Sequence, residues 1–233
     1  MKINLSKTLF YLGILLITSG VLTVSSTLWN NGGANQIVAQ QQKEQAQTLS
    51  PVIVTNAETT IGNGVGEASE PFARMYVPSW GKDYIRPVYQ GTSLTMLDKG
   101  IGHYPSTSLP EQVGNFAVAA HRTTVGANFY KIDELVSGDK IYVETNDALY
   151  EYTFINSVIV KPTEGRVLED NPYGLDLTNS LTNGNKNLKI LTMTSCNPKY
   201  SDAERIIAFS VQTAKYKPNE IPGSIKQEIN IVQ

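Results

Sequence analysis

Leu188-Lys-Ile-Leu-Thr-Met-Thr-Ser-Cys196-Asn-Pro198 is the stretch of this 233-residue chain that constrains the fold most. Residues 188–195 carry mainly apolar or small side chains on both faces, a pattern typical of a strand enclosed by its neighbours. Pro198 then breaks the strand. The stretch therefore predicts a rigid strand that ends at a thiol on the rim of a β domain, and functional groups are common where rigid and irregular structure meet.

Alternation with a period of two residues predicts further strands on both sides of this one. They are expected around residues 115–120, 141–144, 150–155 and 206–211. Asn128 can cap a short helix that Gly138 stops, and a second helical turn is expected near residues 168–173. Roughly seven or eight short strands with one or two small helices predict a mainly β fold that closes into a β-barrel.

The N-terminus predicts a membrane anchor. Lys2 and Lys7 precede the apolar run Leu9–Trp29, and the next charged residue is Lys43. A helix needs roughly 20 apolar residues to cross a bilayer, and basic residues before it favour a cytoplasmic N-terminus with the rest of the chain exported. Because Ser and Thr dilute the run, a cleaved signal peptide is the alternative. Both readings place the remaining residues outside the cytoplasm.

The chain divides into four parts. Residues 1–29 form the cytoplasmic tip and transmembrane anchor, and residues 30–71 read as a flexible stalk because they hold few large apolar side chains. Residues 72–217 have the alternating pattern of a β domain, and residues 218–233 are expected to form a C-terminal tail. The expected location is the cell membrane, with a single pass and an extracellular domain.

Charge and cysteine content exclude some functions and favour others. Lys and Arg total 19 against 21 for Asp and Glu, so no basic excess favours nucleic acid as a partner. Cys196 is the one cysteine, so no internal disulfide can form. Exported proteins that use cysteine for stability carry it in pairs. Cys196 is therefore either a small buried hydrophobe or a reactive thiol.

A reactive thiol needs a cationic neighbour, because at its ordinary pKa near 8.5 only a few per cent is thiolate. His121 follows the predicted strand 115–120, whereas His103 lies in a stretch that reads as a turn. Arg205 opens the last strand; the alternative for it is a surface arginine that pairs with Asp202 or Glu204. The cysteine and histidine spacing fits no zinc site and no nucleotide-binding motif occurs, so neither metal nor cofactor is expected.

Three stretches, in the order His, Cys, Arg, resemble the sortase family. Thr192-Met-Thr-Ser-Cys196 is similar to the family signature Thr-Leu-x-Thr-Cys. The other two are Ala120-His-Arg-Thr-Thr124 with Asn128-Phe129 and Ile132-Asp-Glu-Leu135, and Cys196-Asn-Pro198 with Ser201 to Arg205. The resemblance covers roughly residues 72–217 and implies a closed eight-stranded β-barrel.

Within the family, the short spacing from Cys196 to Arg205 and the stretch Gly102-His-Tyr-Pro105 resemble class E sortases most. Met193 and Ser195 stand where Leu and Thr are commoner, and Ala120 stands where Gly often precedes the histidine. These departures bear on the subclass more than on the family, because Ser195 keeps a hydroxyl.

The resemblance implies a cysteine transpeptidase. Cys196 would cleave a Leu-(Ala or Pro)-x-Thr-Gly sorting signal between Thr and Gly and hold the Thr as a thioester. His121 would supply and accept protons, and Arg205 would stabilise the oxyanion. The partners implied are sorting-signal-bearing secreted proteins and an amine, either of a peptidoglycan precursor or of a pilin lysine.

The resemblance also implies that Tyr104, Thr194 and Ser195 contact the substrate, with Tyr104 linked to a preference for Ala over Pro in the signal. The cell-wall role is favoured by the class E features. A pilin polymerase, a hydrolytic cysteine protease and an exported β domain with an inert cysteine are the alternatives.

Overall fold

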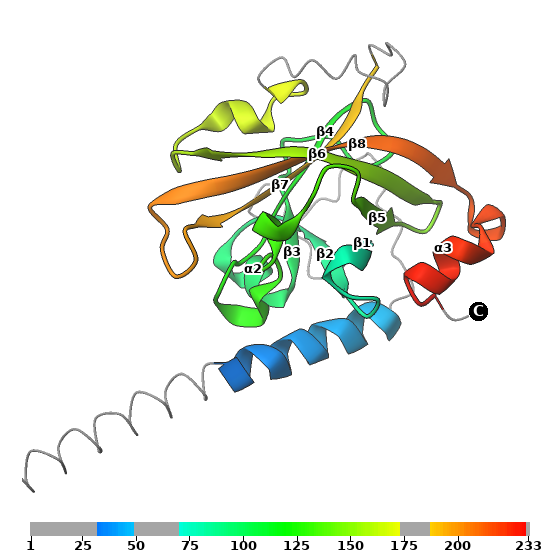
Figure 1. The fold of residues 1–233 in the computed structure, drawn as a ribbon, viewed down its shortest axis with the longest axis horizontal. Helices are drawn as coiled ribbons and strands as arrows, with labels where there is room; N and C mark the ends of the chain where they lie inside the picture. Colours follow the sequence, from blue (N-terminus) through cyan, green and yellow to red (C-terminus); the bar gives the residue numbers. More distant parts are fainter. Residues whose placement is uncertain (1–31, 49–69, 173–186, 232–233) are drawn as a thin grey trace, which may run out of the picture.

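The computed structural model describes residues 32–48, 70–172 and 187–231. In these residues eight strands close into one barrel, in the order β1-β2-β3-β4-β7-β8-β6-β5 (Figure 1). Neighbours pair antiparallel except β2 with β3 and β4 with β7, which are parallel. The prediction of a mainly β, closed eight-stranded barrel is confirmed. The strands are β1 (Ala73–Tyr76), β2 (Ile85–Gln90), β3 (Ile101–His103), β4 (Gly114–Ala119), β5 (Lys140–Glu144), β6 (Leu149–Val160), β7 (Lys189–Asn197) and β8 (Glu204–Tyr216).

The barrel interior is filled by alternate side chains of the strands. Leu191 and Met193 of β7 are fully buried in one core cluster with Phe116 and Val118 of β4 and Ala208 of β8. Burying a large apolar side chain stabilises the fold by about 1.5–3 kcal/mol. Successive strand residues point to opposite faces. Thr192, Thr194 and Cys196, which alternate with the inward-facing positions along β7, therefore lie on the outer face.

Helical structure is more extensive than predicted. The α-helices are α2 (Leu94–Lys99) and α3 (Gly223–Glu228), and residues 32–48 are also helical. Short 3₁₀ turns occur at Pro78–Trp80, Val125–Ala127, Ile132–Glu134, Gly165–Leu168 and Pro218–Glu220. Ile225 of α3 and Ile229, which follows the helix, pack on the outside of the barrel. The residues predicted as a C-terminal tail are therefore partly ordered.

The prediction of a flexible stalk over residues 30–71 is wrong for residues 32–48. This helix runs along one side of the barrel (Figure 1), where Ala46 is fully buried and Lys43 pairs with Asp83. Low apolar content does not prevent docking here, because the buried Ala46 and the polar contacts of Asn35, Gln42 and Lys43 hold the helix on the barrel. Residues 49–69 and the predicted anchor Leu9–Trp29 lie outside the described residues. Among the helices that are described, none is long and apolar enough to cross a membrane.

The helix predicted from Asn128 to Gly138 is replaced by the 3₁₀ turns at Val125–Ala127 and Ile132–Glu134. Asn128 does not cap a helix N-terminus but follows the turn Val125–Ala127. Its side-chain oxygen accepts a hydrogen bond from Arg86, and its carbonyl accepts one from Tyr84. The apolar residues of the pattern are buried in the core, as expected, but as part of an irregular segment. The second helical turn lies at Gly165–Leu168, slightly earlier than predicted.

Candidate active site

Cys196 lies near the end of β7 and is partly exposed. Its register partner on β8 is Arg205, in an antiparallel pair. Side chains directly opposite in such a pair share one face, with Cβ atoms roughly 4.5–5.5 Å apart. The fold therefore brings the predicted nucleophile and the predicted arginine onto the same outer face of the barrel.

The backbone around His121 is fixed by contacts with β7 and with the loop that follows. The amide of Ala120 donates to the carbonyl of Thr194 at 3.2 Å, and the carbonyl of His121 accepts from the amide of Phe129 at 3.0 Å. Because β4 and β7 are parallel neighbours, their ends meet at one rim of the barrel. His121, just after β4, therefore stands at the same rim as Cys196.

A cleft of about 1060 Å³ joins these residues at the rim. His121, Arg122 and Cys196 line it together with the loop Tyr200–Asp202. Residues 32 and 34–36, at the start of the N-terminal helix, form part of its wall. The cleft contains the thiol and the imidazole that nucleophilic acyl transfer requires.

Arg205 faces the loop before β8 in this structure. Its Nη1 donates to the backbone carbonyls of Asp202 and Glu204, both at 2.8 Å. The alternative considered from sequence was pairing with the carboxylates of these two residues, and the contacts are to their carbonyls instead. Arg205 is not among the residues that line the cleft, so it would have to turn toward the thiol to contact a substrate.

Arg122 is a site residue that sequence reasoning missed. Its side chain is 2% exposed, and its guanidinium pairs with Asp133 at 2.8 Å. Nη1 also donates to the carbonyl of Cys196 and to the side-chain oxygen of Asn197, at 3.1 and 3.2 Å. Arg122 thus ties the loop after His121 to the end of β7. Its position directly after the histidine was the available signal.

Asp98, near the end of α2, is a second residue that the sequence analysis did not single out. Its Oδ1 lies 2.9 Å from Nε2 of His121. The signals for α2 were present: Ser93 accepts a hydrogen bond from the Met96 amide as an N-cap, and Gly100 ends the helix. Only the fold shows that this helix lies beside the histidine loop.

The three residues predicted to contact substrate differ in their placement. The Tyr104 hydroxyl lies 3.0 Å from Oγ1 of Thr194, which shares the outer face of β7 with Cys196. Ser195 points the other way, into the barrel, where its hydroxyl donates to the Ala120 carbonyl at 2.8 Å. The prediction that the Ser195 side chain contacts substrate is therefore not supported by its orientation; this bond instead joins the strands of the thiol and the histidine.

His103 is a buried residue of β3, not part of a solvated turn as the sequence suggested. Its ring is 1% exposed, bonds to Gln90 and to the Ser108 carbonyl, and stacks at a tilt on Phe116. Burial lowers the pKa of His103 to about 4. A neutral ring inside the core cannot serve the rim where Cys196 lies.

A protein-family model described as the sortase domain matches residues 75–213, more than half of the chain. The chain belongs to the sortase family. Sortases are transpeptidases, and the matched residues of this sortase run from within β1 to within β8, so that they include Cys196, His121 and Arg205.

The relatives of this sortase include class E members. Sortase SrtE2 of Streptomyces coelicolor is 29% identical over 91% of the chain and 85% of the relative. The structure of sortase E from Streptomyces avermitilis is 28% identical with a TM-score of 0.58, covering 67% of this chain and 97% of that one. SrtF sortase from Corynebacterium diphtheriae is 26% identical with a TM-score of 0.61, covering 76% and 99%. The resemblance to class E sortases is confirmed.

Proposed function

We propose that this sortase cleaves Leu-(Ala or Pro)-x-Thr-Gly sorting signals of secreted proteins and joins the Thr to an amine of a peptidoglycan precursor. The observation that carries the proposal is the cleft in which Cys196 and His121 meet, with Arg205 opposite the cysteine in register. The class E resemblance supports the cell-wall role over pilin polymerisation.

The proposed reaction has two acyl-transfer steps. The Cys196 thiolate attacks the Thr carbonyl, and His121 as imidazolium gives a proton to the departing Gly amine, which leaves a thioester on Cys196. The incoming amine then attacks the thioester, His121 takes up its proton, and the thiolate is released. Arg205 stabilises the oxyanion in both steps with a planar cation that has several donors.

The products distinguish a transpeptidase from a protease. The full chain is incubated with a sorting-signal peptide and a peptide that begins with glycine, and the products are separated by chromatography. We expect a ligated peptide whose yield rises with the amine concentration. Release of the free Thr acid alone, at every amine concentration, would favour a hydrolytic cysteine protease instead.

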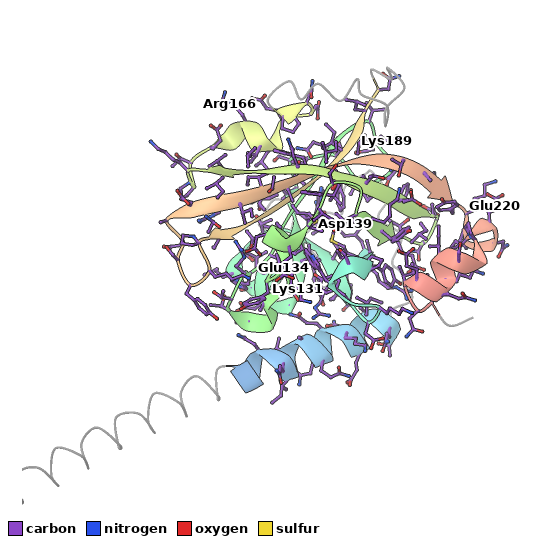
Figure 2. All side chains as sticks on the ribbon, in the orientation of Figure 1. Lys131, Glu134, Asp139, Arg166, Lys189 and Glu220 are labelled. Carbon is purple, nitrogen blue, oxygen red and sulfur yellow. The ribbon has the colours of Figure 1, made fainter. Side chains whose placement is uncertain are left out.

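Arg205→Lys should lower turnover at least tenfold, about 1.4 kcal/mol of barrier. Lysine keeps the charge but loses the fork of donors that can hold the loop carbonyls and an oxyanion together. The matched control is Arg166→Lys, since Arg166 pairs with Glu164 outside the cleft. Figure 2 shows Arg166 at the upper edge of the barrel in that view, away from Lys131 and Glu134 of the segment after His121. Equal rates for wild type and Arg205→Lys would remove Arg205 from the mechanism.

Tyr104 is proposed to set a preference for Ala over Pro in the signal. A phenol beside the substrate backbone can bond the amide N–H that Ala has and Pro lacks, and leaving such a group unpaired costs roughly 1–3 kcal/mol. Wild type should therefore process Leu-Ala-x-Thr-Gly faster than Leu-Pro-x-Thr-Gly, and Tyr104→Phe should narrow the ratio of kcat/KM values. Tyr200→Phe, which alters an exposed tyrosine of the cleft, should not. A wild-type preference for Pro would contradict this role.

The N-terminal run Leu9–Trp29 is proposed to anchor the protein in the cell membrane with its barrel outside. The intact protein should then fractionate with membranes, and protease added to whole cells should digest the barrel. A shortened soluble protein in the medium, as the main species, would show that the run is a cleaved signal peptide.

A further inference from the structure

The hydrogen bond between Asp98 and His121 fixes which ring nitrogen can exchange protons. Asp98 Oδ1 lies 2.9 Å from Nε2 of His121. An ionised carboxylate only accepts hydrogen bonds, so Nε2 must carry the proton in this contact. In the described part of the chain the other nitrogen, Nδ1, has no hydrogen-bond partner. Nδ1 is therefore the atom left to exchange a proton in the cleft.

The backbone that carries Asp98 is held in place from the side of the N-terminal helix. Gln42, which is 3% exposed, donates from Nε2 to the Asp98 carbonyl at 3.1 Å. On its other side Gln42 lies against Gly126, where a Cβ atom would come within 2.6 Å of the Gln42 side-chain oxygen. Gln42 of the N-terminal helix thus contacts both the end of α2 and the loop after His121. Figure 1 shows the helix of residues 32–48 below α2.

The pair lies at the edge of the cleft. The side chain of His121 is 16% exposed and that of Asp98 is 51% exposed. Ion pairs this exposed contribute little to fold stability. The contact of Asp98 with His121 therefore adds little to the free energy of unfolding. Its effect is on the orientation of the His121 ring, which lines the same cleft as Cys196. Arg122, the neighbouring cation, is already paired with Asp133, which leaves Asp98 as the acid that contacts the imidazole.

We propose that Asp98 is a positioning residue: it holds the His121 ring through Nε2 so that Nδ1 faces the thiol and the leaving amine. A positioned imidazole works better because the reacting atoms start in the correct geometry, and a misplacement of about 1 Å can cost roughly 100-fold in rate. This proposal rests on the proposed function, since it assigns a role within that reaction.

The kinetic test compares full-length Asp98→Ala and Asp98→Glu with wild type in the transpeptidation of a sorting-signal peptide. Asp98→Ala should lower kcat by about 10- to 100-fold with little change in KM, since the residue orients a ring and does not bind substrate. Asp98→Glu should recover part of the loss. The control is Asp83→Ala, which removes an exposed carboxylate that contacts the same N-terminal helix but not His121. It should leave kcat unchanged.

A spectroscopic test reports on the ring itself. The chain has two histidines, so ¹⁵N-labelled imidazole signals can be assigned with His121→Ala. In wild type the neutral His121 ring should carry its proton on Nε2, and in Asp98→Ala the two tautomers should mix. Unchanged kcat in Asp98→Ala, or a loss of kcat with an unchanged tautomer, would overturn the proposal. If wild type processes no sorting-signal peptide while the tautomer still depends on Asp98, the proposed function fails and the positioning contact stands.

Discussion

Replacement of Cys196 by alanine should abolish both cleavage of the sorting signal and formation of a covalent acyl-enzyme. Cys196 is the only thiol in the chain, so no other cysteine can take over. The side chain lines the cleft and is partly exposed. Removal of the sulfur should therefore leave the fold intact, because it creates no buried cavity. Turnover is measured with a sorting-signal peptide, and the thermal unfolding midpoint serves as the control.

Normal turnover in Cys196→Ala would show that the thiol is inert and that the chemistry lies elsewhere. Ser195→Ala is the matched variant on the neighbouring position. Its hydroxyl points into the barrel and bonds to Ala120, so this change should lower stability more than it lowers turnover.

His121→Ala should lower turnover by several orders of magnitude. Proton transfer by a positioned side chain contributes about 10²- to 10⁴-fold, and here one imidazole serves both acyl-transfer steps. Its side chain is at the rim and its backbone is held by Phe129, so the variant should fold normally. Turnover close to the wild-type value would exclude His121 as the acid and base.

His103 gives the contrasting result, because the structure places it in the core and not in the turn that the sequence suggested. Because His103 packs in the core between Phe72 and Phe116, His103→Ala should lower the unfolding midpoint rather than act on chemistry alone. Its pKa is lowered to about 4, below the ordinary 6.5. Its contribution to stability is therefore complete above pH 6.5 and is lost as the pH falls toward 4. His121→Ala and His103→Ala should therefore be compared at pH 7–8, where the contribution of His103 to stability is complete.

Strands with a clear apolar or alternating pattern of side chains could be predicted from the sequence. The apolar run that ends at Cys196 is β7, and the alternating stretches are β4, β5, β6 and β8. Their register then follows from the enclosed faces, because a shift of one residue would turn Leu191 and Met193 out of the core. The order His, Cys, Arg was also readable, since each residue ends or begins a predicted strand.

Features that depend on contacts between different elements could not be predicted from the sequence. The helix of residues 32–48 is polar over most of its length, and its docking depends on Gln42 meeting Asp98 and on Asn35 meeting the Thr123 carbonyl. The pair of buried Arg122 with exposed Asp133 and the contact of Asp98 with His121 likewise join residues of different elements. No local spacing encodes such partners.

The central claim is that Cys196 carries the acyl group, and intact-protein mass spectrometry tests it most directly. The full chain is mixed with Leu-Ala-x-Thr-Gly or Leu-Pro-x-Thr-Gly peptide and the masses are followed before and after addition of an amine. We predict an adduct equal to the peptide up to Thr, located on Cys196, that disappears as a new amide product forms. An adduct on another residue, or product formation by Cys196→Ala, would contradict the account.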